Sequence, residues 1–330
     1  MRKHIHICFT VLAVLMVGLV SCTKEIDFTG TQSDPLLVVN GLQQVGQPVS
    51  LHVEKSTFFL DDQPDCRVQD VQVDLYVNGA FKEALQVTDS IEMQEYYVWN
   101  ENGEVLQERM KYAFNYCRGE YLPCEGDELR FEVRSSEFET ATAEVTMPGT
   151  PNVISFDTVR VEVENEYNMK VRLALKLNDP QGSDYYNLYP QGALSGFTSS
   201  DPVFANLTSV DDIEDVFGGE NEYYGYGPYN SFADKFFDGS EYSLSMEVSY
   251  YGGDYYEPFI VEVTCLDVNL YQYLKSYKAY SNTDPDSMVG MFTEPVQVYS
   301  NVRNAIGVVG AQSRPVVMTV DLTGNTSLIK

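Results

Sequence analysis

The sequence predicts a mainly β protein with two domains, an N-terminal β-sandwich and a β-rich C-terminal domain that holds one helix. Three observations support this fold class. Short segments in which apolar and polar residues alternate recur along the chain, as half-buried strands require. Turn signals such as Asn78-Gly79 separate these segments. Helical spacing of apolar residues is found in one segment near the C-terminus. The length of 330 residues, 44% of them hydrophobic, is enough for about two hydrophobic cores.

The N-terminus has the three parts of a secretion signal. A basic start is followed by an apolar stretch at residues 7–20, which is shorter than the ~20 residues that a transmembrane helix needs. The stretch ends in Leu-Val-Ser-Cys, which resembles a bacterial lipobox, so we expect the thiol of Cys22 to be acylated and to anchor the chain in a membrane. Residues 1–21 are then a lipoprotein signal peptide, and residues 22–34 are a polar tether.

Residues 35–150 are expected to form the first domain, an Ig-like or carboxypeptidase-regulatory-like β-sandwich. Two hairpins are predicted, one at Asn78-Gly79 and one closed by residues 101–103, and Pro148-Gly149 ends the series. The expected strands lie at residues 36–41, 48–55, 70–77, 81–87, 95–100, 104–114, 129–135 and 139–147.

Residues 151–330 are expected to form the second, β-rich domain, with long acidic and Tyr-rich loops. Residues 177–234 contain ten Asp or Glu and no Lys or Arg, which indicates connecting loops and short elements rather than core. One helix is expected near residues 268–280, because apolar residues recur at helical spacing from Leu270 to Tyr277 and Asp267 can cap its start. Strands are expected at residues 154–165, 169–179, 241–250, 258–268, 296–300, 304–312 and 315–322.

The charge of the chain excludes several classes of function. There are 21 Lys and Arg against 49 Asp and Glu, which gives a net charge of −28. Such an acidic surface repels a polyanion, so no nucleic-acid partner is expected. Of three histidines, His52 alone lies beyond the signal peptide, which counts against histidine-based catalysis and against a zinc site.

The cysteines beyond Cys22 suggest disulfide bonds, because an exported chain meets an oxidising compartment. Cys117 and Cys124 would close a small loop, and Cys66 could pair with either of them, so these three residues are the disulfide candidates. Cys265 lies in a strand-like run and is expected to be a buried thiol. The sequence does not choose among the pairings.

Aromatic residues mark the candidate binding surface. Tyrosines on flexible loops form recognition surfaces that stack on sugars or contact a partner protein. The alternative is that the rings fill the edges of a β core. The candidates for contact with a ligand or partner are Tyr223, Tyr224, Tyr226 and Tyr229, which share a Gly-rich loop, and Trp99, which precedes a predicted hairpin tip.

Acid-rich segments at residues 61–65 and 211–215 could bind calcium, but neither has the spacing of a calcium loop. No cofactor is therefore expected. Two carboxylates could also serve a glycosidase, yet among 49 acids some pair always falls at the right distance, so this pattern is not selective. Phosphate-cradling loops are absent from the sequence. We expect a protein that is not an enzyme, with no catalytic, cofactor-binding or metal residues.

Several segments also resemble a known family. They are Lys24-Glu25-Ile26-Asp27 after the lipobox, residues 37–42, Asn178-Asp179-Pro180 before residues 184–186, residues 232–239, and residues 294–301 with Gly307 and Gly310. Together they resemble a Bacteroidetes outer-membrane lipoprotein family catalogued as domain of unknown function number 4249. One departure is Asn304-Ala305-Ile306, where the family pattern has Asn-Gly-hydrophobic, and it affects a local turn.

This resemblance implies an outer-membrane lipoprotein that faces the cell surface and works beside a TonB-dependent transporter in nutrient uptake. A glycan or a peptide is the ligand expected for the Tyr-rich loops. The resemblance implies no catalytic residues. Two alternatives stay open, a cell-surface adhesion or structural lipoprotein and a surface hydrolase that uses paired carboxylates.

Overall fold

The computed structural model divides into two compact units, Met1–Asp34 and Pro35–Lys330. It describes residues 34–57, 65–99, 105–163, 168–191, 194–198, 201–203, 208–210, 229–251, 258–283 and 296–320. The expected signal peptide, Cys22 and nearly all of the tether lie outside these residues. Within them, no helix has the length and apolar character needed to cross a membrane.

The second unit is built mainly from strands, with one helix among the described residues, as expected. The elements are β1 (Leu37–Gln44), β2 (Ser50–Lys55), β3 (Gln72–Val77), β4 (Ala80–Ala84), β5 (Gln86–Trp99), β6 (Val105–Arg118), β7 (Glu128–Arg134), β8 (Ala141–Thr146), β9 (Val153–Val163), β10 (Asn168–Asn178), β11 (Tyr185–Gln191), β12 (Leu194–Thr198), β13 (Thr208–Val210), β14 (Tyr229–Ala233), β15 (Glu241–Tyr251), β16 (Phe259–Leu266), α3 (Val268–Ser281), β17 (Val309–Gln312) and β18 (Val316–Val320).

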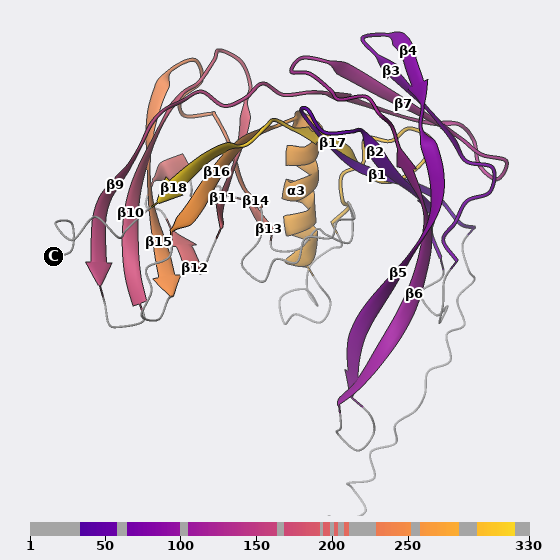
Figure 1. Ribbon diagram of the computed structural model, residues 1–330, viewed down its shortest axis with the longest axis horizontal. Helices are drawn as coiled ribbons and strands as arrows, with labels where there is room; N and C mark the ends of the chain where they lie inside the picture. Colours follow the sequence, from indigo (N-terminus) through magenta and orange to yellow (C-terminus); the bar gives the residue numbers. More distant parts are fainter. Residues whose placement is uncertain are drawn as a thin grey trace, which may run out of the picture. The chain divides into compact units, whose positions relative to one another are not determined.

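The strands form one large sheet and two four-stranded sheets. The large sheet has the order β13-β14-β11-β16-β17-β1-β2-β6-β5, and β18 pairs with β16 (Figure 1). The smaller sheets have the orders β12-β15-β10-β9 and β4-β3-β7-β8. β1 runs parallel to β17 with Gly41 opposite Val309, so segments from the two ends of the unit lie side by side.

The first core follows from the alternation that the sequence predicts. Along β1, every second residue is buried, and the same pattern recurs in β7. Leu51, Leu75 and Phe131 are fully buried there, and each such side chain contributes about 1.5–3 kcal/mol through burial. Val309 and Ala311 of β17 belong to the same core. The first core therefore takes residues from both sides of residue 150, and the domain boundary expected there stays a prediction.

The second core lies between the sheet of β10 and β15 and the strands β11 and β16 of the large sheet. Leu173 and Leu244 are fully buried on one side, and Tyr186 and Leu188 on the other. Residues 177–234 were expected to be loops rather than core, and that expectation is wrong for β11 and β14. Buried Asn187 in β11 and the consecutive buried residues Asn230 and Ser231 in β14 interrupt the apolar pattern, which weakens the strand signal in the sequence.

Helix α3 begins and ends close to where the sequence predicts. The carboxylate of Asp267 accepts hydrogen bonds from the N–H groups of Asn269 and Leu270, which caps the first turn. Leu270 packs against β17, where a Cβ atom on Gly310 would lie 2.8 Å from the Cβ of Leu270. Glycine at this position lets the helix approach the sheet closely, which supports a third, smaller core.

The segment before β17 differs from the sequence prediction. Residues 296–300 and 304–308 were expected in strands, but the structure has strand there only from Val309 onward. The side-chain amide of Asn301 takes the place of a strand partner, since its Oδ1 accepts from the N–H of Val309 and its Nδ2 donates to the carbonyl of Val309. Asn304 has a positive φ of 59°, so the Asn304-Ala305 pair still makes a turn without the expected glycine.

The hairpin at Asn78-Gly79 is confirmed, and so is the pairing of the two strands of the second hairpin, whereas residues 101–103, expected to close it, lie outside the described residues. Asn78 and Gly79 have φ values of 51° and 80°, as a two-residue hairpin turn requires, and they join β3 to β4. β5 and β6 pair along their whole length, up to Trp99 opposite Val105. The expected strand at residues 81–87 is divided, because β4 ends at Ala84 and β5 begins at Gln86.

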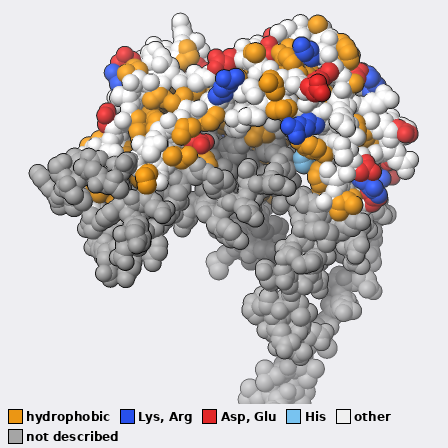
Figure 2. Space-filling view, viewed as in Figure 1, with side chains coloured by type: hydrophobic (Ala, Val, Ile, Leu, Met, Phe, Trp, Pro, Cys, Tyr) orange, Lys and Arg blue, Asp and Glu red, His pale blue; other side chains and the backbone are white. Residues whose placement is uncertain are grey.

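The described surface carries an apolar area on one face. Figure 2 shows hydrophobic side chains gathered where β9, β10 and β18 lie in Figure 1. Ile154 and Val159 of β9 are 45% and 51% exposed, and Val317 of β18 is 52% exposed. An exposed group of this kind is a candidate contact surface for a partner.

Candidate functional site

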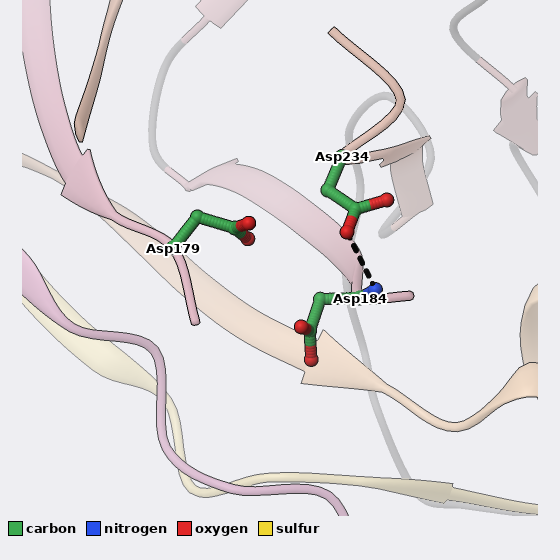
Figure 3. Close-up of side chains that lie close together, drawn as sticks. All are labelled: Asp179, Asp184 and Asp234. Atoms are coloured by element: carbon green, nitrogen blue, oxygen red, sulfur yellow. Dashed lines mark hydrogen bonds between the residues drawn. The ribbon is translucent and has the colours of Figure 1, made fainter. Parts of the chain in front are cut away.

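Three carboxylates from separate segments meet at one end of the second core. Asp179 follows β10, Asp184 precedes β11 and Asp234 follows β14. One oxygen atom of each lies within 4.8 Å of the others, and we call these residues the acidic trio (Figure 3). The antiparallel pairing of β11 with β14 brings Asp184 and Asp234 together across 50 residues of sequence.

Hydrogen bonds hold the acidic trio in place. The hydroxyl of Tyr186 donates to Oδ1 of Asp179 at 2.5 Å, and the N–H of Gly239 donates to its Oδ2 at 2.9 Å. The N–H of Asp184 donates to Oδ2 of Asp234 at 3.0 Å, as the dashed line in Figure 3 marks. Both oxygens of Asp179 and one of Asp234 therefore have a donor from the chain itself.

Burial and mutual repulsion raise the pKa of two members. Asp179 and Asp234 are 3% and 5% exposed, whereas Asp184 is partly exposed. Burial, and then the charges of Asp179, Asp234 and Asp238, raise the pKa of Asp184 to about 6. Burial also raises the pKa of Asp234, while its hydrogen bond from the Asp184 N–H works in the opposite direction.

The acidic trio can take up a positive charge in two forms. Carboxylates this close repel one another, and either a shared proton or a divalent cation relieves that repulsion. Calcium takes six to eight oxygen ligands, so three carboxylates would supply part of its shell. The chain's own donors already occupy both oxygens of Asp179 and one of Asp234. The raised pKa of Asp184 indicates that a proton on this carboxyl relieves part of the repulsion.

Sequence reasoning missed the acidic trio and placed acidic clusters elsewhere. Residues 211–215, 61 and 62 lie outside the described residues. Asp65 is described, and both of its carboxylate oxygens accept from the guanidinium of Arg67, with Nη2 at 2.6 Å from Oδ2. Asp179 and Asp184 fall in a segment that the family resemblance singled out, and that was the available signal.

The aromatic candidates fall at the limits of the described residues. Tyr223, Tyr224 and Tyr226 lie outside them. Tyr229 begins β14 opposite Val210, and Trp99 ends β5 opposite Val105, which fixes the position of their backbones. Their role in contacting a ligand or partner stays a prediction.

The cysteines do not form the disulfide that was expected. No disulfide joins Cys66, Cys117, Cys124 and Cys265, the four cysteines in the described part of the chain. Cys117 is buried in β6 among apolar side chains of the first core, whereas Cys124 is exposed in the loop before β7. Burial raises the pKa of the Cys66 and Cys117 thiols to about 11 and about 12. Cys265 is a buried thiol, as expected.

Comparison with curated proteins finds no match. A glycosyl hydrolase family 2 member from Bacteroides cellulosilyticus is 12% identical, with a TM-score of 0.17, over 70% of this chain and 27% of that one. Collagen adhesin from S. aureus is 9% identical, with a TM-score of 0.20, over 88% of this chain and 95% of that one. The chain thus spans about a quarter of the length of the hydrolase, and scores this low carry no argument about function.

The family comparison covers most of the sequence. The match extends over residues 23–315 and includes all three members of the acidic trio. It also includes the turn at Gly307 and the close approach at Gly310 that position β17. The chain therefore belongs to the family described as a domain of unknown function (DUF4249).

Proposed function

We propose that the protein is a lipid-anchored lipoprotein of the outer membrane that faces the cell surface and binds beside a TonB-dependent transporter during nutrient uptake. The observation that carries this proposal is the lipobox-like sequence that ends at Cys22, directly before a polar tether and a β-rich unit. Two or three acyl chains on one cysteine give stable anchoring, because each buried methylene contributes about 0.8 kcal/mol.

The proposed role is binding rather than catalysis. His52 is the histidine that remains after signal removal, and its ring stacks on Phe114 in the sheet. Burial lowers the pKa of His52 to about 4, so the ring accepts no proton at neutral pH. Exposed Ile154, Val159 and Val317 offer an apolar surface of the kind that contacts a partner protein. A glycan or a peptide is the proposed ligand, and no nucleic acid is expected.

The anchoring is tested by removing the thiol that is expected to be acylated. Cys22→Ala removes the thiol to which the lipid is expected to be attached, so we expect the variant to leave the membrane fraction. Cys124→Ala is the matched control, because this exposed cysteine lies in a surface loop far along the sequence from the lipobox. The proposal fails if Cys22→Ala stays membrane-bound to the same extent as Cys124→Ala.

A further inference from the structure

A second cluster of side chains lies on the face of the large sheet that turns away from the first core. On β2, Leu51 and Val53 point into the core, so the residues that alternate with them face the other side. β2 pairs with β6 in a register that places His52 opposite Tyr116. We call the group that shares this face the aromatic–carboxyl cluster: His52, Glu54, Tyr112, Phe114 and Tyr116.

The members of the aromatic–carboxyl cluster contact one another directly. The ring of His52 stacks on Phe114 with centroids 4.7 Å apart and meets Tyr116 edge-on at 5.3 Å. The ring centroids of Tyr112 and Phe114 are 5.6 Å apart, and the hydroxyl of Tyr112 donates to Oε2 of Glu54. Phe114 is buried, whereas the other four keep part of their surface exposed. The carboxyl group of Glu54 therefore lies at one end of a row of four rings.

Glu54 is partly buried, and no cation in the described part of the chain pairs with it. Asp74 pairs with Arg134 at 2.5 Å, and Glu247 pairs with Arg172 at 3.2 Å. Lys55, the next residue after Glu54, pairs with Glu137 at 3.5 Å. Within the described residues, the partner of Glu54 is the neutral hydroxyl of Tyr112.

Two described titratable groups beside Glu54, those of His52 and Cys66, are uncharged at neutral pH. Burial lowers the pKa of His52 to about 4 and raises that of the nearby Cys66 thiol to about 11. Across β1, the residue opposite Glu54 is Val38. Burial raises the pKa of Glu54 itself to about 7. A carboxylate in such surroundings gains from an opposite charge, because little water is left to stabilise it.

We propose that the aromatic–carboxyl cluster binds an organic cation, through a charge-assisted hydrogen bond to Glu54 and contact of the cation with the neighbouring rings. A primary ammonium or a guanidinium has both features, since it donates hydrogen bonds to a carboxylate and is attracted to aromatic rings. A metal ion fits less well, because one carboxylate supplies too few of the six to eight oxygens that calcium takes. The net charge of −28 favours the approach of any cation.

This inference deepens the proposed binding role by naming a class of ligand. The inference rests on the proposed function only for the purpose that cation binding would serve in uptake. Cation binding itself needs neither the lipid anchor nor the transporter. A failure of cation binding is therefore distinct from a failure of anchoring or of transporter association.

The test is saturation-transfer difference NMR on the full chain in detergent, with n-butylammonium chloride as the probe and butan-1-ol as its uncharged analogue. We expect transfer to the ammonium and none to the alcohol. Glu54→Gln keeps the shape of the side chain and removes the charge, so we expect it to abolish the signal. Glu144→Gln, at an exposed carboxyl on β8, is the control and keeps the signal. Equal signals from alcohol and ammonium, or an unchanged signal in Glu54→Gln, would overturn the proposal.

A pH series on the unmodified chain gives an independent check that requires no variant to fold. With a pKa of about 7, the ionised fraction of Glu54 rises about tenfold between pH 6 and pH 8, and the affinity for butylammonium is expected to rise by the same factor. His52 and Cys66 do not titrate in this range. A flat pH profile contradicts the proposal. The peptide acetyl-Gly-Lys-Gly-amide distinguishes a small free amine from a lysine side chain of a protein as the natural ligand. If this peptide binds more tightly than butylammonium, the site is assigned to a protein side chain.

Discussion

Asp184→Asn removes one of the three charges of the acidic trio and leaves a side chain of the same shape. In the folded protein the carboxyl of Asp184 has a pKa of about 6, against an ordinary value of 3.8, because it is partly buried and faces Asp179, Asp234 and Asp238. The carboxyl is therefore easier to ionise in the unfolded chain than in the folded one. Its ionisation lowers the free energy of unfolding, and asparagine avoids that loss.

The sign and the size follow from proton linkage. Because the folded pKa is raised, the folded state holds the proton more tightly, so stability is highest below pH 3.8 and is lost as the pH rises through 6. A difference of about two pH units at about 1.4 kcal/mol each gives about 3 kcal/mol as the upper bound. Asp184 is partly exposed, so solvent screening reduces this to about 1–2 kcal/mol.

Urea unfolding of the wild type and of Asp184→Asn at pH 4, 6 and 8 measures the effect. We expect equal stability near pH 4 and an advantage of about 1–2 kcal/mol for the variant at pH 8. Asp157→Asn, at an exposed carboxyl on β9, is the matched control and should change little. The reasoning is refuted if Asp184→Asn is less stable than the wild type at pH 8, or if its stability falls with pH as steeply as that of the wild type.

Three other predictions concern positions where the fold depends on one residue. Gly307→Ala is expected to lower the free energy of unfolding by at least about 2 kcal/mol, since φ is +116° and the new Cβ would lie 2.2 Å from the carbonyl oxygen of Val39; an unchanged melting temperature contradicts this. Asp267→Ala leaves the N–H groups that start α3 without an acceptor, so urea unfolding should show that the free energy of unfolding falls by about 2–4 kcal/mol. A fall of less than about 0.5 kcal/mol would be inconsistent with the cap. Tyr186→Phe removes the donor to Asp179 and should cost about 1–3 kcal/mol, measured by thermal unfolding at pH 8, where a stabilised variant would argue against the hydrogen bond.

Local signals in the sequence predict much of the fold. The helical spacing from Leu270 to Tyr277 and the capping type of Asp267 together place α3, because both act within a few residues. Asn78-Gly79 predicts its hairpin for the same reason, since a two-residue turn needs positive φ at both positions. Alternation then predicts which face of β1 and β7 is buried.

Features that depend on distant residues are not visible in the sequence. The segment before β17 has the pattern of a strand, but it pairs with β1 through the isolated bridge of Ile306 with Val38, and the amide of Asn301 binds the backbone of Val309. The acidic trio forms because β11 pairs with β14. The sequence near Asp184 contains no pattern that predicts Asp234 as its neighbour. Glu54 is one of many acids in the sequence, and the pairing of β2 with β6 is what brings Tyr112 to its carboxyl.

We propose that this protein works in the outer membrane beside a transporter. The measurement that tests it most directly is gentle detergent extraction of the tagged, full-length protein from its native membrane, followed by affinity capture and quantitative mass spectrometry. We expect a TonB-dependent barrel to be captured in near-equal amount, and to be absent when the Cys22→Ala variant is used. Capture of the protein alone, with the lipid anchor intact, would contradict the account and favour a free-standing surface adhesin.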